Sequence, residues 1–147
     1  VGLDIATGEY IAFLDSDDWI KDESLSLLYD EAVKHHADVV MGNMWLCHQD
    51  GSMDKPFKCI SNGSIKKLLS GKEGFIELVK TCFYLPTPVR YIYNRKYLHK
   101  MQARFEEGIM HEDELWCPIV LCQAERIFLQ IPFATVLPES FRFFRAL

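Results

Sequence analysis

Asp15-Ser16-Asp17-Asp18 is the densest acidic group in the first part of the chain. It follows an apolar run at residues 10–14, whose length and abrupt end are typical of a buried strand. Asp15 and Asp17 stand two positions apart in a predicted turn, where their carboxylates can approach one ion. Mg²⁺ and Mn²⁺ take one or two protein carboxylates and complete their coordination with water and phosphate oxygens. The segment therefore predicts a Mg²⁺ or Mn²⁺ site at the carboxyl end of a strand, where open α/β sheets bind ligands.

The acidic turn has other interpretations. In a solvated loop, its acids would only cap the helix predicted from Asp22. In a haloacid-dehalogenase-type phosphatase, Asp15 would be a nucleophile, but that chemistry needs a downstream catalytic lysine, and we find no convincing lysine segment. An EF-hand is excluded by spacing, because its glycine would fall at Ile20 and its closing glutamate at Ser26.

A second acidic group, Glu112-Asp113-Glu114, lies where a helix is predicted to begin. Acids in a first helical turn are ordinary, because the helix dipole favours negative charge there. The alternative is catalytic. Transfer to a hydroxyl with inversion at the reacting carbon needs a carboxylate general base, and a separate metal to take up charge on a leaving diphosphate. The chain has an acidic centre for each task.

The elements around the first acidic group alternate between strand and helix. The strand at 10–14 precedes a helix capped by Asp22, and residues 38–47 are rich in β-formers. One face of the helix is predicted to be apolar, formed by Leu25, Leu28, Tyr29, Ala32 and Val33. This strand-helix-strand order predicts a parallel or mixed α/β sheet.

Shorter elements are predicted in the rest of the chain. They are a helix from near Lys72, a loop at Pro86 and Pro88, a strand over 91–93, a helix over 96–101, a helix beginning at 111–114, and short strands over 127–144. Pro118 fits the helix that begins at 111–114 only in or near its first turn, because proline has no N–H to donate. No linker or repeat divides the sequence, so we expect a single domain over residues 1–147.

Composition and charge exclude some classes of protein. An apolar fraction of 49% is typical of globular proteins, and no apolar run approaches the roughly 18 residues that cross a bilayer. The net charge of −5 argues against a nucleic-acid partner. Residues 1–31 hold nine acidic side chains and one basic one, Lys21, which suits either a solvated face or a bound cation. The five cysteines have no metal-site spacing and are interpreted as reduced.

Two segments of the chain resemble a known family. The stretch GLDIATGEYIAFLDSDDWI is similar to the passage of family 2 glycosyltransferases that carries their metal-binding DXD motif, and RFEEGIMHEDELW resembles their Glu-Asp motif. The intervening PVRYIYNRKYLHKMQARF is similar to the segment that precedes this motif in bacterial members. The resemblance implies an α/β fold of the GT-A type, Rossmann-like, with a mixed sheet flanked by helices.

The family pattern also implies roles for individual residues. Asp17 would be the principal metal ligand, and Asp15 would assist through the metal or the ribose. Asp113 would be the general base, with Glu112 in support. Trp19 has two interpretations, a wall of the donor-sugar site and a side chain packed on the sheet.

The resemblance implies a metal-dependent reaction. A sugar would pass from a nucleotide-sugar, a UDP-sugar first of all, to a hydroxyl of a glycan or lipid-linked acceptor, with inversion. The expected setting is bacterial surface glycan synthesis in the cytoplasm or at the inner face of the membrane. The alternative is a non-catalytic module that binds metal or nucleotide-sugar.

Family members begin with a region that cradles the uracil and ribose, and this chain does not show it. We therefore expect residues 1–147 to be the central and C-terminal part of a GT-A domain, with little or no transfer by this piece alone.

Other residues have weaker claims to function. His111 would contact the diphosphate or only begin a helix, and Arg90 and Arg95 would meet phosphate or only water. Trp116 is predicted to be core. The aromatic and arginine residues at 141–145 have two interpretations, a contact with a membrane or lipid-linked acceptor and core exposed at a domain edge.

Overall fold

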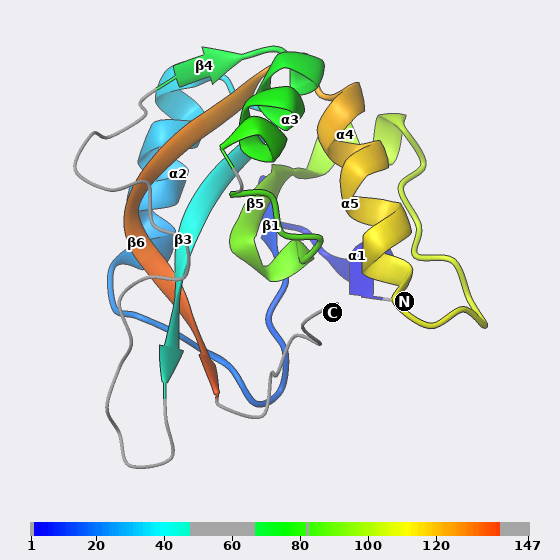
Figure 1. Cartoon of the computed structure of the whole chain (residues 1–147), viewed down its shortest axis with the longest axis horizontal. Helices are drawn as coiled ribbons and strands as arrows, with labels where there is room; N and C mark the ends of the chain where they lie inside the picture. Colours follow the sequence, from blue (N-terminus) through cyan, green and yellow to red (C-terminus); the bar gives the residue numbers. More distant parts are fainter. Residues whose placement is uncertain (1, 48–66, 82, 139–147) are drawn as a thin grey trace.

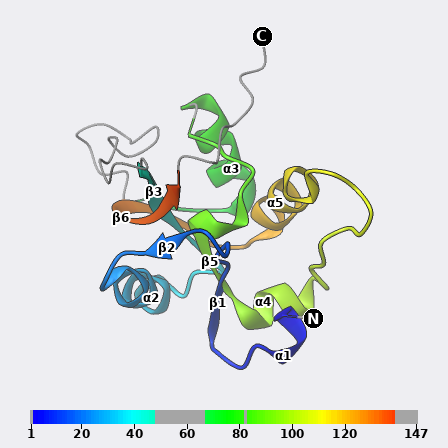
Figure 2. The ribbon, with the colours of Figure 1, turned by 90° about the horizontal axis from the view of Figure 1, so that it is seen from below.

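The computed structural model describes residues 2–47, 67–81 and 83–138. Its helices are α1 (Gly2–Ile5), α2 (Ser24–His35), α3 (Gly71–Lys80), α4 (Arg95–Lys100) and α5 (Glu112–Gln123), with a 3₁₀ turn at Pro88–Arg90. Its strands are β1 (Tyr10–Ala12), β2 (Trp19–Ile20), β3 (Val39–Cys47), β4 (Lys67–Leu69), β5 (Tyr91–Asn94) and β6 (Ile127–Pro138). The sheet lies between α2 on one face and α3 and α5 on the other (Figures 1 and 2).

The sheet is mixed and has the strand order β1-β5-β3-β6-β2, with β4 also pairing with β6. β1 and β3 both run antiparallel to β5, so they are parallel to each other with β5 between them. β3 and β6 pair in parallel, whereas β2 and β4 run antiparallel to β6. The predicted strand-helix-strand unit and the mixed sheet are therefore present, but β1 and β3 are not neighbours.

Both faces of the sheet are buried, as the alternation along its central strands shows. Val39, Met41, Tyr91 and Tyr93 belong to the core on the side of α3 and α5. Val40, which lies between the first two, packs with Ala32 of α2 in the core of the opposite face. Apolar side chains on both faces explain why residues 39–41 at the start of β3 are all apolar and do not alternate with polar residues.

The α2 helix departs from the sequence prediction in two ways. Asp22 is not its N-cap, because the helix begins at Ser24 and its N-cap is Glu23, which has a left-handed backbone with φ 66° and makes no side-chain cap bond. Ala32 is fully buried, but Leu25, Tyr29 and Val33 are more than 40% exposed. The face that packs on the sheet is thus narrower than the predicted stripe.

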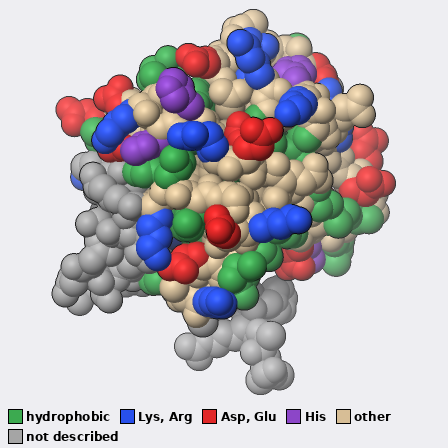
Figure 3. All heavy atoms as spheres, turned by 90° about the horizontal axis from the view of Figure 1, so that it is seen from above, with side chains coloured by type: hydrophobic (Ala, Val, Ile, Leu, Met, Phe, Trp, Pro, Cys, Tyr) green, Lys and Arg blue, Asp and Glu red, His purple; other side chains and the backbone are tan. Residues whose placement is uncertain are grey.

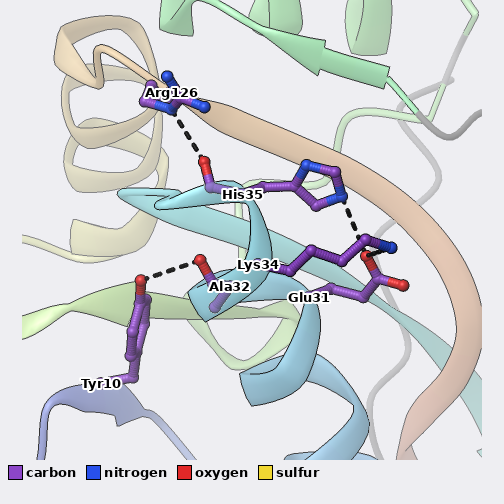
Figure 4. Close-up of polar contacts among 6 residues, drawn as sticks. All are labelled: Tyr10, Glu31, Ala32, Lys34, His35 and Arg126. Carbon is purple, nitrogen blue, oxygen red and sulfur yellow. Dashed lines mark hydrogen bonds and ion pairs between the residues drawn. The ribbon is translucent and has the colours of Figure 1, made fainter.

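The C-terminal end of α2 is held by side chains from two other segments (Figure 4). The Tyr10 hydroxyl donates to the Ala32 carbonyl at 3.4 Å, and Arg126 Nε donates to the His35 carbonyl at 2.9 Å. Arg126 thus satisfies a carbonyl that the end of a helix leaves without a helical partner, whereas the Ala32 carbonyl also accepts the Ala37 N–H, and the Tyr10 hydroxyl lies closer to the Ala37 carbonyl, at 2.7 Å. His35 also lies 3.1 Å from Glu31 and stacks on Phe128. These contacts describe a structural role for His35.

α3 and α5 pack closely because α3 begins with glycine. A Cβ on Gly71 would lie less than 3.0 Å from the carbonyl oxygens of Leu121, Ala124 and Cys122. The Gly71 N–H donates to the Ala124 carbonyl at 2.9 Å. The start of α3 is further fixed by a capping box between Ser70 and Glu73.

Replacing Gly71 with alanine is expected to lower the free energy of unfolding by about 1–3 kcal/mol, because the new methyl group meets backbone that cannot yield. Gly74→Ala in the same helix is the matched control. Its Cβ would be 3.5 Å from Ile127, an ordinary contact, and alanine favours the helix by up to about 1 kcal/mol. Urea denaturation measures both changes. Equal effects of the two substitutions would contradict this account of the contact.

The elements β2, β6 and α5 also differ from their sequence predictions. β2 was not expected, and it pairs with β6 at Trp19↔Val136. Residues 127–138 form one strand rather than several, because β6 accommodates Pro132 within a shift of register against β3. Pro118 lies in the interior of α5 rather than its first turn.

The surface carries charges of both signs. Figure 3, which views the molecule from above Figure 1, shows acidic, basic and histidine side chains interspersed. Exposed pairs such as Lys67–Glu77 and Lys100–Glu125 contribute at most about 1 kcal/mol each, so the core dominates stability. Among the described residues, no helix combines the length and the apolar character that spanning a membrane would require.

Candidate active site

The first acidic segment leaves the sheet immediately after β1. The ladder between β1 and β5 ends at Ala12↔Ile92, two residues before the end of the predicted strand. Residues 13–18 then turn, and the Asp18 N–H donates to the Asp15 carbonyl at 3.1 Å. Asp15 and Asp17 are exposed in this turn, and Asp18 is half-buried. The structure thus places the acids in a turn at the carboxyl end of a strand, as the sequence predicted.

Asp18 has the most perturbed electrostatic environment in this turn. Both its carboxylate oxygens are shielded from solvent and accept no hydrogen bond from the described part of the chain. Burial, and secondarily the charges of Asp15 and Asp17, raises the pKa of Asp18 to about 7. Burial and the charge of Asp17 also raise the pKa of Asp15. A shielded carboxylate without a partner is costly, and a bound cation would offset that cost.

The donors available suit only some metals. Within the described residues, no three or more His, Cys, Asp and Glu side chains form a group that could hold a metal. A closed zinc-type site, which needs about four protein ligands, therefore does not fit the described part of the chain. Mg²⁺ and Mn²⁺ need fewer protein ligands, because they take one or two carboxylates and complete their coordination with water and phosphate oxygens.

The charge on Asp18 predicts a pH-dependent stability of the metal-free protein. At pH values between 3.8, the ordinary pKa of aspartate, and about 7, the Asp18 carboxyl keeps its proton in the folded chain but loses it in the unfolded chain. The free energy of unfolding therefore falls as pH rises through that window. We expect Asp18→Asn to stabilise the protein by about 1 kcal/mol at pH 8, after allowance for solvent screening, and by clearly less at pH 5, where the folded chain still keeps the proton.

Chemical denaturation at pH 5 and pH 8 measures this difference. Asp30→Asn, which changes an exposed acid on α2, is the control and should be the same at both pH values. An Asp18→Asn effect that does not depend on pH would contradict the burial of a charged carboxylate.

The second acidic segment begins α5. His111 is the N-cap, with a left-handed backbone at φ 60°, and it is exposed. Glu112, Asp113 and Glu114 occupy the first turn, where the helix dipole favours negative charge. Asp113 is half-buried, and its Oδ1 accepts the Glu114 N–H at 3.0 Å. Burial raises the pKa of Asp113 in spite of this hydrogen bond. A raised carboxylate pKa suits a group that must accept a proton.

The two acidic segments meet through an aromatic cluster. The Phe13 ring, two residues before Asp15, lies edge-on to Trp116 and Phe105 with both centroids at 5.5 Å. Trp116 is one helical turn beyond Asp113 and is buried, as the sequence predicted. Phe13 is thus in contact with residues distant in the sequence, and these contacts lie next to both acidic segments.

A cleft of about 610 Å³ lies beside this cluster. Its walls include Phe13 from the first segment, Glu112 from the second, and the loop residues Phe105, Glu106 and Glu107. The lining therefore combines aromatic surface with carboxylates, which can hold the apolar face and the hydroxyl groups of a sugar respectively.

The remaining predicted site residues have mixed outcomes. Trp19 lies in β2 and is 43% exposed, so it is not packed fully against the sheet. Arg90 neither meets phosphate nor lies in solvent: it is 1% exposed, and its Nε donates to the Gly42 carbonyl at 3.2 Å. Arg95 Nε donates to the Gly8 carbonyl at 2.6 Å. The tail at 141–145 lies outside the described residues.

Sequence reasoning assigned no role to Asp18, Phe13 or Phe105. Asp18 is part of the acidic group, but its burial depends on how the turn folds. Phe13 lies in the apolar run, and only its change from strand to turn distinguishes it from its neighbours.

Known proteins similar to this chain are glycosyltransferases. GlyG of Streptococcus pneumoniae serotype 4 is 25% identical over 138 residues, which cover 88% of this chain and 46% of GlyG. GlyA of the same organism is 28% identical over 116 residues, or 76% of this chain and 16% of GlyA. The chain thus spans less than half the length of each of these relatives.

A solved structure shows the same fold. The crystal structure of S. aureus TarS 1-349 in complex with UDP matches with a TM-score of 0.71 and 24% identity, over 92% of this chain and 37% of TarS 1-349. The same protein in complex with UDP-GlcNAc matches with a TM-score of 0.70. The predicted fold class, part of a GT-A mixed sheet flanked by helices, is confirmed.

The family model for glycosyl transferase family 2 matches residues 1–101, more than half of the chain. This match includes the acidic turn at Asp15–Asp18 and ends before Glu112. Together with the relatives and the fold, it establishes that the chain belongs to glycosyl transferase family 2.

Proposed function

We propose that the complete protein containing this chain transfers a sugar from a nucleotide-sugar to an acceptor hydroxyl, with inversion and with Mg²⁺ or Mn²⁺. The observation that carries the proposal is the packing of Phe13 against Trp116, which brings the segment of Asp15 and Asp17 together with the segment of Asp113. TarS in complex with UDP and with UDP-GlcNAc supports a UDP-sugar as donor.

Asp113 is the proposed general base. In the proposed reaction its carboxylate takes the proton of the acceptor hydroxyl as that oxygen attacks the anomeric carbon. The bond between this carbon and the donor's diphosphate oxygen breaks, and the nucleoside diphosphate leaves. Half-burial makes Asp113 a better proton acceptor than an ordinary aspartate, because it raises the pKa. Glu112, on the same helical turn, lines the cleft and is proposed to contact the acceptor.

Asp17, assisted by Asp15, would hold the metal. When bound, Mg²⁺ or Mn²⁺ supplies positive charge to the departing diphosphate, a contribution of several kcal/mol in metal-dependent transfers. Asp18 supports the assignment of a cation to this turn, because its shielded oxygens lack a partner in the described part of the chain. Trp19, partly exposed just beyond the acids, is proposed to wall the donor site.

The acceptor is proposed to be a glycan or a lipid-linked glycan in the synthesis of a bacterial surface polymer. The aromatic and carboxylate lining of the cleft beside Glu112 supports a hydroxylated acceptor. Such acceptors would place the protein at the cytoplasmic face of the membrane.

The test is transfer by the complete gene product from a panel of UDP-sugars, with release of UDP measured with Mn²⁺ and after EDTA. We expect UDP to be released from at least one donor, and we expect EDTA to abolish this release. The anomeric configuration of the product should be opposite to that of the donor. Activity that survives EDTA would reject the metal, and a retained configuration would reject inversion. Binding of UDP-sugars without release or transfer would favour a non-catalytic module.

A further inference from the structure

The sheet alone does not fix the position of the proposed metal-binding turn relative to the proposed base. The ladder with β5 ends at Ala12, and residues 13–18 continue outside it. The proposed base stands on α5, which packs mainly on α3. Some contact beyond β1 must therefore fix the distance between Asp15 and Asp113.

Phe13 makes the ring contacts that can do this. Its ring lies edge-on to Phe105 at 5.5 Å and 88°, to Trp116 at 5.5 Å and 81°, and to Tyr93 at 5.7 Å and 72°. Phe105 in turn stacks on Trp116, with centroids 4.6 Å apart and planes at 18°. Edge-to-face and stacked pairs prefer defined separations, so a cluster of this kind fixes distance as well as burying area.

The chain distances from this cluster to the acids are short. Only Leu14 separates Phe13 from Asp15, and Asp15 begins the turn that the Asp18 N–H closes. Asp113 and Trp116 are three residues apart on one helix, which places them on neighbouring positions of its surface. A displacement of the Phe13 ring is thus transmitted to both acidic segments through very few rotatable bonds.

We propose that Phe13, clamped by Phe105 and Trp116, is the positioning residue that sets the separation between the metal-binding turn and the catalytic base. The consequence for catalysis rests on the proposed function, but the coupling of the two segments does not. Loss of the ring is expected to leave the metal ligands and the base intact and to let their separation vary. A displacement of about 1 Å in the reacting groups can lower the rate of a reaction about a hundredfold.

Phe75 provides a matched control. Like Phe13 it is half-buried against the main core, and it makes an edge-on contact of 4.9 Å, with Tyr84. It lies on α3, which carries neither acidic segment. Phe13→Leu and Phe75→Leu therefore remove the same atoms from the same core, but only the first alters the link between the two acidic segments.

The first measurement uses NMR of this chain and needs neither metal nor substrate. Phe13→Leu is expected to shift the backbone amide signals of residues 15–18 and also those of 112–114. Phe75→Leu is expected to leave 15–18 unchanged. Shifts confined to 15–18 in Phe13→Leu would overturn the coupling. Should Phe13→Leu not fold, Phe105→Leu, a loop substitution, must shift both segments.

The second measurement uses kinetics of the complete gene product. Phe13→Leu is expected to lower kcat about 10- to 100-fold, with the donor KM and the Mn²⁺ requirement nearly unchanged, whereas Phe75→Leu keeps kcat at a similar Tm. An equal loss of kcat in both variants would show that Phe13 contributes only to packing of the core and does not position the two acidic segments. Absence of transfer in the wild type would reject the proposed function, and the NMR result would still decide the coupling.

Discussion

Replacing Asp113 with asparagine in the complete gene product is expected to lower kcat for sugar transfer by about 10²–10⁴-fold, the usual contribution of a general base. Asparagine keeps the shape of the side chain and can still accept the Glu114 N–H, but it cannot take the acceptor proton. The donor KM and the Mn²⁺ requirement should change little, because neither depends on proton transfer. Initial rates at saturating Mn²⁺ over a range of donor concentrations measure both parameters.

Glu114→Gln is the matched control for Asp113. It replaces a carboxylate by an amide in the same helical turn, but Glu114 is exposed. We expect kcat to fall only a few-fold, because the substitution weakens no more than the interaction of this side chain with the helix dipole. Transfer that survives Asp113→Asn undiminished would show that another group is the base.

The pH dependence of the wild-type rate offers a second view of Asp113. The base must be ionised in order to act, so the rate falls on the acid side as its carboxylate is protonated. Because burial raises this pKa, the fall is expected at a higher pH than an ordinary aspartate would give.

Asp17→Asn is expected to lower kcat/KM by about 10²–10³-fold and to raise the Mn²⁺ concentration needed for half-maximal rate, since charge on the leaving diphosphate would lose its main support. Asp15→Asn should have a smaller effect of the same kind. Titration of activity with Mn²⁺ separates these effects, because a variant with a weakened metal site recovers at high Mn²⁺. The Asp113→Asn variant should not recover.

Asp22→Asn controls for the general negative charge of this segment. Asp22 is an exposed acid four residues beyond Asp18, so its substitution removes one negative charge near the turn and leaves the turn itself unchanged. A similar Mn²⁺ shift in Asp22→Asn and Asp17→Asn would indicate that the segment attracts cations only diffusely.

The sequence predicted the features that depend on local pattern. An apolar run ending at acids gave the position of the turn, and acids at the start of a periodic segment gave the first turn of α5. The helix predicted from near Lys72 is present as α3, which begins one residue earlier, at Gly71, after the capping box of Ser70 and Glu73. Asp22 failed as a cap because the left-handed backbone of Glu23 delays the start of α2.

Features that depend on distant partners were not predictable from pattern. β2 has two residues and exists only because β6 pairs with it. Arg90 looks like a surface arginine in the sequence, but the carbonyl groups of Gly42 and Phe83 accept from its buried guanidinium. The contact of Phe13 with Trp116 joins residues about a hundred positions apart, so only the fold reveals what brings the two acidic segments together.

We propose that the segment of Asp15 and Asp17 binds the metal and that the segment of Asp113 does not. Electron paramagnetic resonance of free Mn²⁺, titrated with the complete gene product in the presence of UDP, tests this assignment most directly. The wild type and Asp113→Asn are expected to take up Mn²⁺ equally, and Asp17→Asn is expected to take up much less. Equal uptake by all three proteins, or uptake lost in Asp113→Asn and kept in Asp17→Asn, would contradict the assignment of metal and base.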